Sequence, residues 1–482
     1  MKYKKSAFKA LLTVVTLLAV LACSACREEE KYLTGINRVT YQATTDRRDD
    51  RVTIYTYVTE DDESLAYDNN TKFYYPLLEM SHMYNNYCSS MKNGSDSVYL
   101  VKFPSRESMI QQMSTEIMAG SGPDIIILDN QLPIRKLMDK GAFEDLNSYI
   151  ENDKSEKALN LADYDERLLN AGVYKGKRYM MPMLIEPDVY VTKNNLLKSA
   201  GLKKTTRLTF DNLVGKLGNF TRTMPNTSLF DSYESSLDFV YRYIGDNINF
   251  DNNTVSFNSE KFRKNIELIR DMVQNSMKKG TYNNISDDAC LFDKGYLDSE
   301  GMYNINNYNY SLMWVNARLD SYSDMSVYGE EQTQSTLTAS ALKGEDTSTV
   351  FINGLTKSSK DNRAFVSCGF MINANSKMKE KAYAFIRYAM GERMQRYITD
   401  DGANFNIPVN KKSLEEIMQN SDNKEIKRYE ENLQNLNTYT VEDGYYNQNV
   451  IADLVQDYLG GKISTDNFIE NLMSKTVIYL NE

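Results

Sequence analysis

The sequence predicts an α/β protein that begins with a parallel sheet, and three observations support this. Residues 51–58 and 98–103 are rich in β-branched and aromatic side chains, which is typical of strands. Residues 125–128 form a short aliphatic run, as expected for a parallel strand buried on both faces. Predicted helices at about 71–90 and 105–118 separate the three strands. This alternation predicts a doubly wound sheet with helices on its faces.

The second of these helices has the most clearly marked face and end. Met109, Met113 and Ile117 recur at helical spacing, which predicts one buried face. The sequence GSGPD at residues 120–124 then ends the helix, because its glycines allow a tight reversal and Pro123 cannot continue a helix. The chain is therefore expected to turn directly into the buried third strand.

Polar residues follow the first and third predicted strands. Thr59 and Glu60 come after the first strand, and Asp129 and Asn130 come after the third. Ligands of open α/β sheets bind outside the carboxyl ends of the strands. We therefore predict Glu60, Asp129 and Asn130 as groups that line a ligand site. Asp129 could instead cap the turn that follows it.

The N-terminus has the pattern of an export signal that ends in a cysteine. Four lysines lie within residues 1–9, an apolar run follows at residues 10–21, and small residues precede Cys23. The apolar run is too short for a spanning helix, which needs about 20 apolar residues. The pattern resembles a bacterial lipobox, which implies that the thiol of Cys23 is diacylated. Cys26 is a second possible lipidation point, and a plain secretory signal is the alternative.

Lipidation at this position would place the protein on the outer face of the cell membrane. Residues 1–22 are then the signal peptide, and residues 23–50 are a tether with few aliphatic residues and no periodicity. Two acyl chains give stable membrane attachment, whereas one gives only marginal binding. We expect an extracellular, membrane-anchored protein of a Gram-positive-type cell.

Composition argues against several classes of function. The chain has 66 acidic and 56 basic residues, a net charge of -10, and no basic stripe, so nucleic acid is not an expected partner. His82 is the only histidine, which limits acid–base chemistry near neutral pH. Cys88, Cys290 and Cys368 are widely spaced, so neither a metal site nor a cofactor is predicted. Nucleophile-elbow, zinc-protease and phosphate-loop motifs are lacking, and no enzyme activity is predicted.

Several short motifs in a fixed order resemble the extracellular solute-binding protein family 1, whose maltose-binding-like members deliver sugars to ABC importers. They cover nearly the whole mature chain, at residues 120–126, 141–146, 176–182, 193–202, 367–377, 406–410 and 458–464. The sequence departs from the family pattern in two places. Phe210 replaces a usual tryptophan, and Asn353-Gly354-Leu355 replaces a proline-rich turn.

The resemblance implies a two-lobed periplasmic-binding-protein type II fold, in which each lobe is a mixed sheet flanked by helices. The crossings between lobes are expected near residues 184–187, just before Gly369, and near residues 404–408. The N-terminal lobe is then residues 45–185 with 367–403, and the C-terminal lobe is residues 187–366 with 405–482.

The resemblance also implies ligand-binding residues. Glu186 occupies the crossing position at which maltose-binding relatives place a carboxylate that accepts hydrogen bonds from sugar hydroxyls. Trp314 lies in a predicted strand that the family turns toward the ligand, where an indole could stack on a sugar ring. Asn404 lies at the third crossing. A solvated glutamate and a core tryptophan are the alternative interpretations, and the tyrosine-rich and asparagine-rich residues 303–310 could bind sugar or form a plain loop.

The predicted function is a lipid-anchored receptor, expected to be a monomer, that captures a carbohydrate and presents it to an ABC transporter permease. An oligosaccharide is the expected ligand, and a peptide or another polar solute stays open. Asp61, Asp62 and Glu63 permit a second hypothesis, a surface polysaccharide hydrolase that uses paired carboxylates. A third hypothesis is a sensory protein whose closed form binds a receptor kinase.

Overall fold

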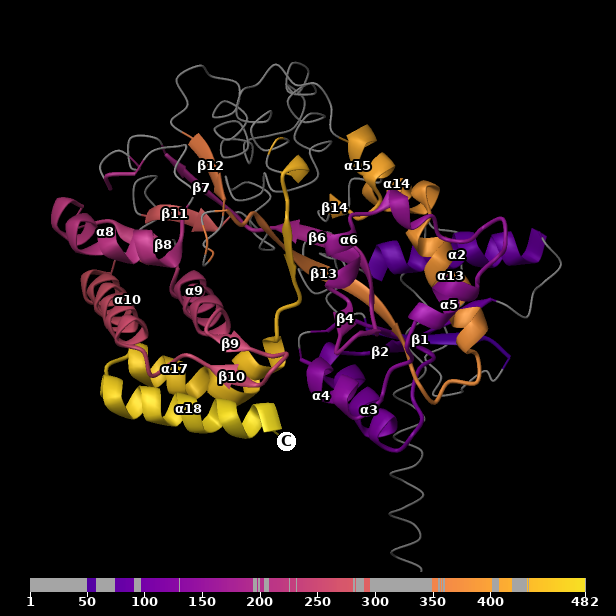
Figure 1. Cartoon of the computed structure of the whole chain (residues 1–482), viewed down its shortest axis with the longest axis horizontal. Coiled ribbons are helices and arrows are strands. Elements are labelled where there is room, and N and C mark those ends of the chain that lie inside the picture. The colour runs from indigo at the N-terminus through magenta and orange to yellow at the C-terminus, as the bar shows by residue number, and fades with distance from the viewer. Residues whose placement is uncertain are drawn as a thin grey trace, which may run out of the picture. The chain divides into compact units, whose positions relative to one another are not determined.

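Two larger β-sheets, each beside its own group of helices, organise the chain (Figure 1). The structure is a computed structural model of the 482-residue protein. It describes residues 50–57, 74–90, 97–129, 131–193, 200–202, 208–224, 226–230, 232–280, 290–294, 349–353, 360–400, 407–417 and 433–481, with single described residues at 197, 282, 356, 358 and 431.

The first sheet has seven strands and contains the predicted parallel start. Its order is β14-β6-β13-β3-β1-β2, with β15 also paired to β13. The strands are β1 (Val52–Tyr57), β2 (Val98–Phe103), β3 (Ile125–Ile127), β6 (Met181–Pro187), β13 (Arg363–Ile372), β14 (Ile407–Pro408) and β15 (Thr438–Thr440). β1 pairs in parallel with both β2 and β3, which confirms the expected topology.

Helices and short segments surround this sheet. They are α2 (Tyr74–Ser90), α3 (Arg106–Met118), α4 (Ile134–Asp139), α5 (Asn147–Asn152), the 3₁₀ turn η4 (Leu161–Asp163), α6 (Glu166–Asn170), the hairpin β4 (Val173–Tyr174) and β5 (Lys177–Arg178), α13 (Lys379–Met390), α14 (Glu392–Asp400) and α15 (Lys411–Ile417). In α3 the side chain of Ser105 accepts a hydrogen bond from the backbone N–H of Ser108, and Met109, Met113 and Ile117 are buried as predicted.

The GSGPD turn after α3 is hydrogen-bonded to β1 and to the segment that follows β13. Gly120 and Gly122 have φ values of 75° and 105°, which side chains other than glycine rarely adopt. Asp124 then accepts hydrogen bonds through Oδ2 from the backbone N–H and the hydroxyl of Thr53 in β1, at 2.8 and 2.7 Å. Its Oδ1 accepts from the hydroxyl of Ser376, which lies beyond β13. The turn therefore sets where β3 enters the sheet.

The second sheet has four strands in the order β12-β7-β11-β8. They are β7 (Val189–Lys193), β8 (Ser228–Phe230), β11 (Cys290–Lys294) and β12 (Thr349–Asn353). The elements around it are α8 (Phe210–Thr223), α9 (Tyr233–Gly245), the hairpin β9 (Ile248–Asn249) and β10 (Thr254–Val255), α10 (Glu260–Lys279), the π-helix η9 (Tyr446–Ile451), α17 (Ala452–Leu459) and α18 (Thr465–Asn481).

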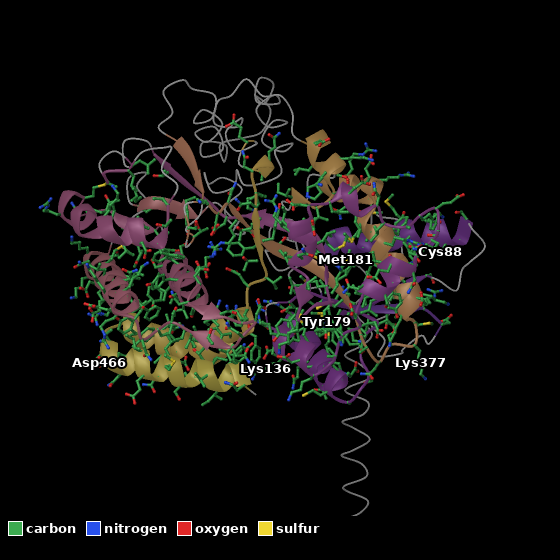
Figure 2. The ribbon with its side chains drawn as sticks, viewed as in Figure 1. Cys88, Lys136, Tyr179, Met181, Lys377 and Asp466 are labelled. Atoms are coloured by element: carbon green, nitrogen blue, oxygen red, sulfur yellow. The ribbon has the colours of Figure 1, made fainter. Side chains whose placement is uncertain are left out.

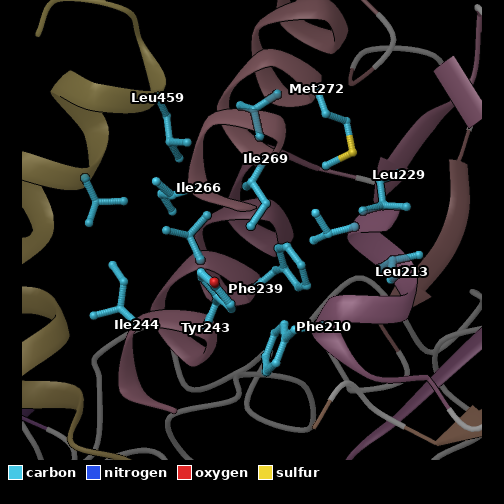
Figure 3. Packing of buried hydrophobic residues seen from close by; sticks show 14 of the residues in the cluster. Phe210, Leu213, Leu229, Phe239, Tyr243, Ile244, Ile266, Ile269, Met272 and Leu459 are labelled. Carbon is cyan, nitrogen blue, oxygen red and sulfur yellow. The ribbon is translucent and has the colours of Figure 1, made fainter. Parts of the chain in front are cut away.

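These helices share a large apolar core with β8 (Figure 3). Phe210, which stands where the family pattern has tryptophan, is buried with its ring 5.4 Å from that of Phe239 and 5.2 Å from that of Tyr243. Leu459 of α17 belongs to the same cluster as Ile266 of α10. The C-terminal helices are therefore part of the second core, although most of that core comes from the middle of the sequence.

β14 lies where the sequence predicts the third crossing between the lobes, near residues 404–408. Ile407 and Pro408 pair with Ile185 and Leu184 of β6, in the first sheet. Val409 is buried, and its backbone N–H donates to Oε1 of Gln395 in α14. These apolar residues are covered by first-sheet elements, so the chain joins the second core only after β15. The predicted lobe boundaries stay predictions.

Figure 2 shows the side chains on the ribbon and labels six of them. Tyr179 and Met181 are buried beside or within β6, whereas Lys377 and Asp466 are exposed. Cys88 is buried, and none of the three cysteines in the described ranges forms a disulfide. Within the same ranges, no helix has the length and apolar character needed to cross a membrane. No group of three potential metal ligands occurs there either.

The backbone of a neighbouring segment leaves no room for a side chain at Gly172. A Cβ atom on Gly172 would lie 1.9 Å from the carbonyl oxygen of Met180. We expect Gly172→Ala to lower the free energy of unfolding by about 2 kcal/mol or more, because the backbone itself must shift. Urea unfolding followed by circular dichroism measures the change.

Gly215→Ala is the matched control. Gly215 lies in α8, and a Cβ there would meet nothing within 4 Å. Alanine should therefore stabilise the protein by up to about 1 kcal/mol through its higher helix propensity. Equal unfolding midpoints for the two variants would contradict the prediction.

Candidate functional site

The carboxyl ends of four strands lie at one edge of the first sheet. β1, β2 and β3 run in parallel. β13 runs antiparallel to β3, and β6 runs antiparallel to β13, so β6 has the same direction as the first three strands. Ligands of open α/β sheets bind at the carboxyl edge. This edge includes Asp129, just past β3, and Glu186, near the end of β6, and it is the candidate functional site.

Asp129 is held by a neighbouring arginine. The guanidinium of Arg106 donates through Nε and Nη2 to the two carboxylate oxygens of Asp129, at 2.9 and 2.8 Å. Oδ1 of Asp129 also accepts from the backbone N–H of Gln131 at 2.7 Å, which is the turn-capping role that the sequence left open. Both oxygens thus have donors within the protein. The prediction that Asp129 lines a ligand site stays a prediction.

Arg106 was missed at the sequence level, although it lies at the same edge. It is the first residue of α3, directly after β2, and its side chain is 22% exposed. A paired, bidentate arginine is rigid and keeps its direction when a ligand arrives. The sequence feature that would have indicated Arg106 is its position at the start of the helix that follows the second strand.

Glu186 is half-buried at the end of β6, where it pairs with Phe365 of β13. Both its neighbour Ile185, at 2% exposed, and Leu184, which lies on the same face of the strand as Glu186, are buried. Glu186 is the one residue of β6 that is not buried, and it lies near the end of the strand. This arrangement is compatible with the predicted role of Glu186 as an acceptor for ligand hydroxyls.

The second sheet has its own carboxyl edge, where two tyrosines meet. The side chain of Ser232 caps α9 directly after β8, which places Tyr233 and Ser236 in the first helical turn. The hydroxyl oxygens of Ser236 and Tyr282 are 2.9 Å apart, and the rings of Tyr233 and Tyr282 meet edge to face at 6.4 Å. Burial, together with the carboxylate of Glu234, raises the pKa of Tyr233.

This tyrosine pair offers both an apolar ring face and polar groups. The abundance of tyrosine is plain from the sequence, but the residues that it suggested for sugar binding are 303–310 and not this pair. Tyr233 and Tyr282 are far apart in the sequence, and only the packing of α9 brings them together. No local motif could have identified them.

The remaining predicted residues lie outside the described part of the chain. They are Glu60, Asn130, Trp314, Asn404 and the lipidation candidate Cys23. Residues 61–63 and 303–310 also lie outside it. Of the predicted ligand-binding residues, the structure therefore places Asp129 and Glu186, and it places both at one sheet edge.

A separate cavity of about 470 Å³ lies beside the β9–β10 hairpin. It is lined by Arg135, residues 247–251 and residues 254–256. The guanidinium of Arg135 stacks on the ring of Phe250, with 4.1 Å to the ring centroid, and its Nε is 3.9 Å from Oδ2 of Asp443. No residue that the sequence predicted as ligand-binding lines this cavity.

Several solved structures share the fold of this protein. An oligosaccharide periplasmic-binding protein candidate from Synechococcus sp. MITs9220 superposes with a TM-score of 0.58 at 14% identity, over 89% of this chain and 98% of that one. The substrate-binding protein Lmo0181 from Listeria monocytogenes, solved with cycloalternan, gives 0.53 at 15% identity, over 88% and 97%. The cyclic α-maltosyl-1,6-maltose binding protein from Arthrobacter globiformis gives 0.54 at 15% identity, over 89% and 98%.

At these identities the likeness establishes the fold, which is the two-lobed α/β fold of periplasmic-binding proteins. No curated protein sequence matches the chain. The sequence profile described as bacterial extracellular solute-binding protein matches residues 92–433. Since this match covers well over half of the sequence and the fold agrees with it, the chain belongs to the bacterial extracellular solute-binding proteins.

Proposed function

We propose that this protein is a receptor that captures an oligosaccharide between its two lobes and delivers it to the permease of an ABC importer. The family match supports a role in solute binding. Two of the similar structures concern cyclic sugars: one protein was solved with cycloalternan, and the other is named as a binding protein for cyclic α-maltosyl-1,6-maltose. The observation that carries the proposal is the shared sheet edge at which Glu186 and the Arg106–Asp129 pair lie.

In this proposal each part of the site has a chemical role. The carboxylate of Glu186 accepts hydrogen bonds from two or more sugar hydroxyls. The rings of Tyr233 and Tyr282 pack against the apolar face of a pyranose, while the hydroxyl of Tyr282 keeps its hydrogen bond with Ser236. Glu60, Asn130, Trp314 and Asn404 complete the predicted set of ligand-binding residues.

Ligand capture then works by a shift in population. A sugar that contacts residues of both lobes makes its full set of interactions only when the lobes are closed. The closed state is therefore favoured by the difference in affinity between the two states. The permease would recognise this closed form.

Lipidation of Cys23 on the outer face of the membrane is part of the same proposal. A diacylated N-terminus attaches the receptor stably, and the tether at residues 23–50 lets the folded part move beside the permease. Confinement raises the effective concentration of receptor at the importer. Labelling with a palmitate analogue, compared between the wild type and Cys23→Ser, tests the anchor.

The first prediction of this proposal concerns binding and closure. Isothermal titration calorimetry with maltotriose, maltopentaose and cycloalternan should find at least one sugar that binds with micromolar or lower Kd. Small-angle scattering should show a smaller radius of gyration with that sugar, because ligand favours the closed state. A protein that binds none of these sugars and never compacts would overturn the proposal, and release of reducing sugar would indicate a hydrolase.

The second prediction concerns Glu186. Glu186→Gln removes the negative charge but keeps the shape, so it should weaken binding of the sugar by about 10-fold or more, since hydrogen bonds to a charged acceptor are worth about 1.5–3 kcal/mol. Calorimetry measures the change. Glu151→Gln, at an exposed position in α5, is the control and should bind like the wild type. Equal affinity of the two variants would remove Glu186 from the site.

The third prediction separates the ring of Tyr233 from its hydroxyl. Tyr233→Ala should weaken sugar binding by roughly 3- to 10-fold, because a stacking contact of about 0.5–1.5 kcal/mol is lost. Tyr233→Phe keeps the ring and should retain most of the affinity. If both variants lose affinity equally, the hydroxyl and not the ring face would be the contact.

A further inference from the structure

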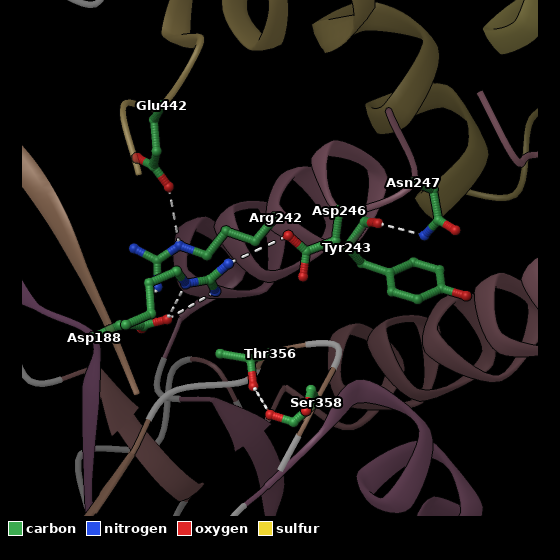
Figure 4. A network of polar contacts seen from close by, with 9 residues as sticks. Asp188, Arg242, Tyr243, Asp246, Asn247, Thr356, Ser358 and Glu442 are labelled. Carbon is green, nitrogen blue, oxygen red and sulfur yellow. Dashed lines mark hydrogen bonds and ion pairs between the residues drawn. The ribbon is translucent and has the colours of Figure 1, made fainter. Parts of the chain in front are cut away.

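An ion cluster with a buried centre joins three strand-connecting segments to one helix of the second core (Figure 4). Its outermost carboxylate, Glu442, is 43% exposed. Asp188 lies between β6 and β7, Arg363 begins β13, and Glu442 follows β15. All three belong to segments that connect the first sheet to elements of the second core. The other two members come from α9: Arg242 lies in its last turn, and Asp246, which caps its end, accepts from Nη1 of Arg363 at 3.3 Å.

Asp188 is the centre of the cluster. Its Oδ2 accepts from Nε and Nη2 of Arg363 at 3.0 and 2.8 Å, and its Oδ1 accepts from Nη1 of Arg242 at 2.8 Å. The side chains of Asp188, Arg363 and Arg242 are 2%, 5% and 11% exposed. The backbone N–H of Asp188 also donates to the carbonyl of Arg363 at 2.9 Å. Both carboxylate oxygens of Asp188 are therefore held by guanidinium groups from different elements.

Arg242 also reaches the third connecting segment. Its Nε donates to Oε1 of Glu442 at 3.1 Å, and its guanidinium lies 4.2 Å from the ring centroid of Phe365 in β13. Burial by itself would lower the pKa of Arg242, but the carboxylates of Asp188 and Glu442 raise it well above its usual value. The guanidinium is thus charged, and it contacts all three connecting segments at once.

The position of the cluster relates it to the candidate site. Glu186 lies two residues before Asp188 on the same segment. Tyr233 lies at the other end of α9, nine residues before Arg242, or about 14 Å along a helix that rises 1.5 Å per residue. One rigid helix therefore connects the ion cluster to the tyrosine pair.

Buried charges are costly to desolvate, and a well-packed apolar group often stabilises a fold as much. The planar guanidinium of Arg242, however, donates to two carboxylates at once, and its fixed fork sets both distance and angle between them, which an apolar contact does not. The cluster is therefore better suited to fixing an orientation than to adding stability.

We propose that Arg242 is a positioning residue for ligand binding, which fixes the angle of α9, and with it Tyr233, relative to the strand that carries Glu186. The inference rests on the proposed function of the same site. It adds that the orientation of the second core in the ligand-free protein is set by the contacts of Arg242 with Asp188 and Glu442.

The test measures orientation and affinity separately. Arg242→Met keeps the aliphatic stem and removes the charge, whereas Arg242→Lys keeps the charge but has no planar fork to bridge two carboxylates. Arg263→Met, which removes an ion pair with the 79% exposed Asp466 in the same core, is the matched control. Nitroxides are introduced as non-natural amino acids at exposed Glu156 and Asn275, so that the native cysteines stay unlabelled.

In the ligand-free protein, double electron–electron resonance should give a broader distance distribution for Arg242→Met than for the wild type. Arg242→Lys should be intermediate, and Arg263→Met should match the wild type. For a sugar that binds the wild type, tested with maltotriose and cycloalternan, Arg242→Met should raise Kd by about 10-fold, and Arg242→Lys should recover part of the loss. A purely structural role would change the unfolding midpoint but not the distribution measured far below it.

An unchanged distribution in folded Arg242→Met would overturn the inference. If that variant does not fold, Arg242→Lys and Glu442→Gln are measured instead. A distance distribution equal to that of the wild type in both of these variants would also overturn the inference. The resonance measurement needs no ligand, so it stays informative if neither sugar binds the wild type. In that case the choice of sugar in the proposed function fails, while the positioning role is still tested.

Discussion

The arrangement of the candidate site depends on one strand, β13, which is inserted antiparallel between β3 and β6. Because of this insertion, β6 runs in the same direction as β1 and β3, and Glu186 reaches the edge at which Asp129 lies. The insertion requires close packing, since a Cβ on Gly369 of β13 would lie 2.4 Å from the sulfur of Met180. Register shifts beside Gly369 show that the strand bends there. The backbone of β13 thus decides which side chains share an edge.

Ion pairs at the connections between the two sheets also hold parts of the structure together. Asp188 follows Glu186 on the same segment, and it is held by Arg363 from β13 and by Arg242 from α9. The candidate ligand acceptor and the ion cluster are therefore neighbours in the sequence but differ in burial. Glu186 is half-buried, whereas Asp188 is only 3% exposed. One short segment can thus combine ligand contact with orientation of the second core.

Much of the first sheet could be predicted, because its signals are local. Strands β1, β2 and β3 and helix α3 agree with the sequence-based ranges to within one or two residues. Glycine and proline in the turn at residues 120–124 act on the backbone directly, whatever surrounds them. The sequence alone does not say which core residues 407–409 join, because Ile407 and Val409 are apolar and could enter either one. Only the neighbours that cover them, β6 and α14, decide between the two.

The sequence by itself determined the α/β class, the order of the first elements and the family, whereas the ligand-binding role that it predicts for Asp129 and Glu186 stays a prediction. It could do so because periodicity, turn residues and short motifs act over a few positions along the chain. Tertiary structure alone decided that Arg106 clamps Asp129, that Tyr233 meets Tyr282, and that Arg242 joins Asp188 to Glu442. Each of these contacts joins residues at least 20 positions apart. Their distance is set by how strands and helices pack, which no local pattern encodes.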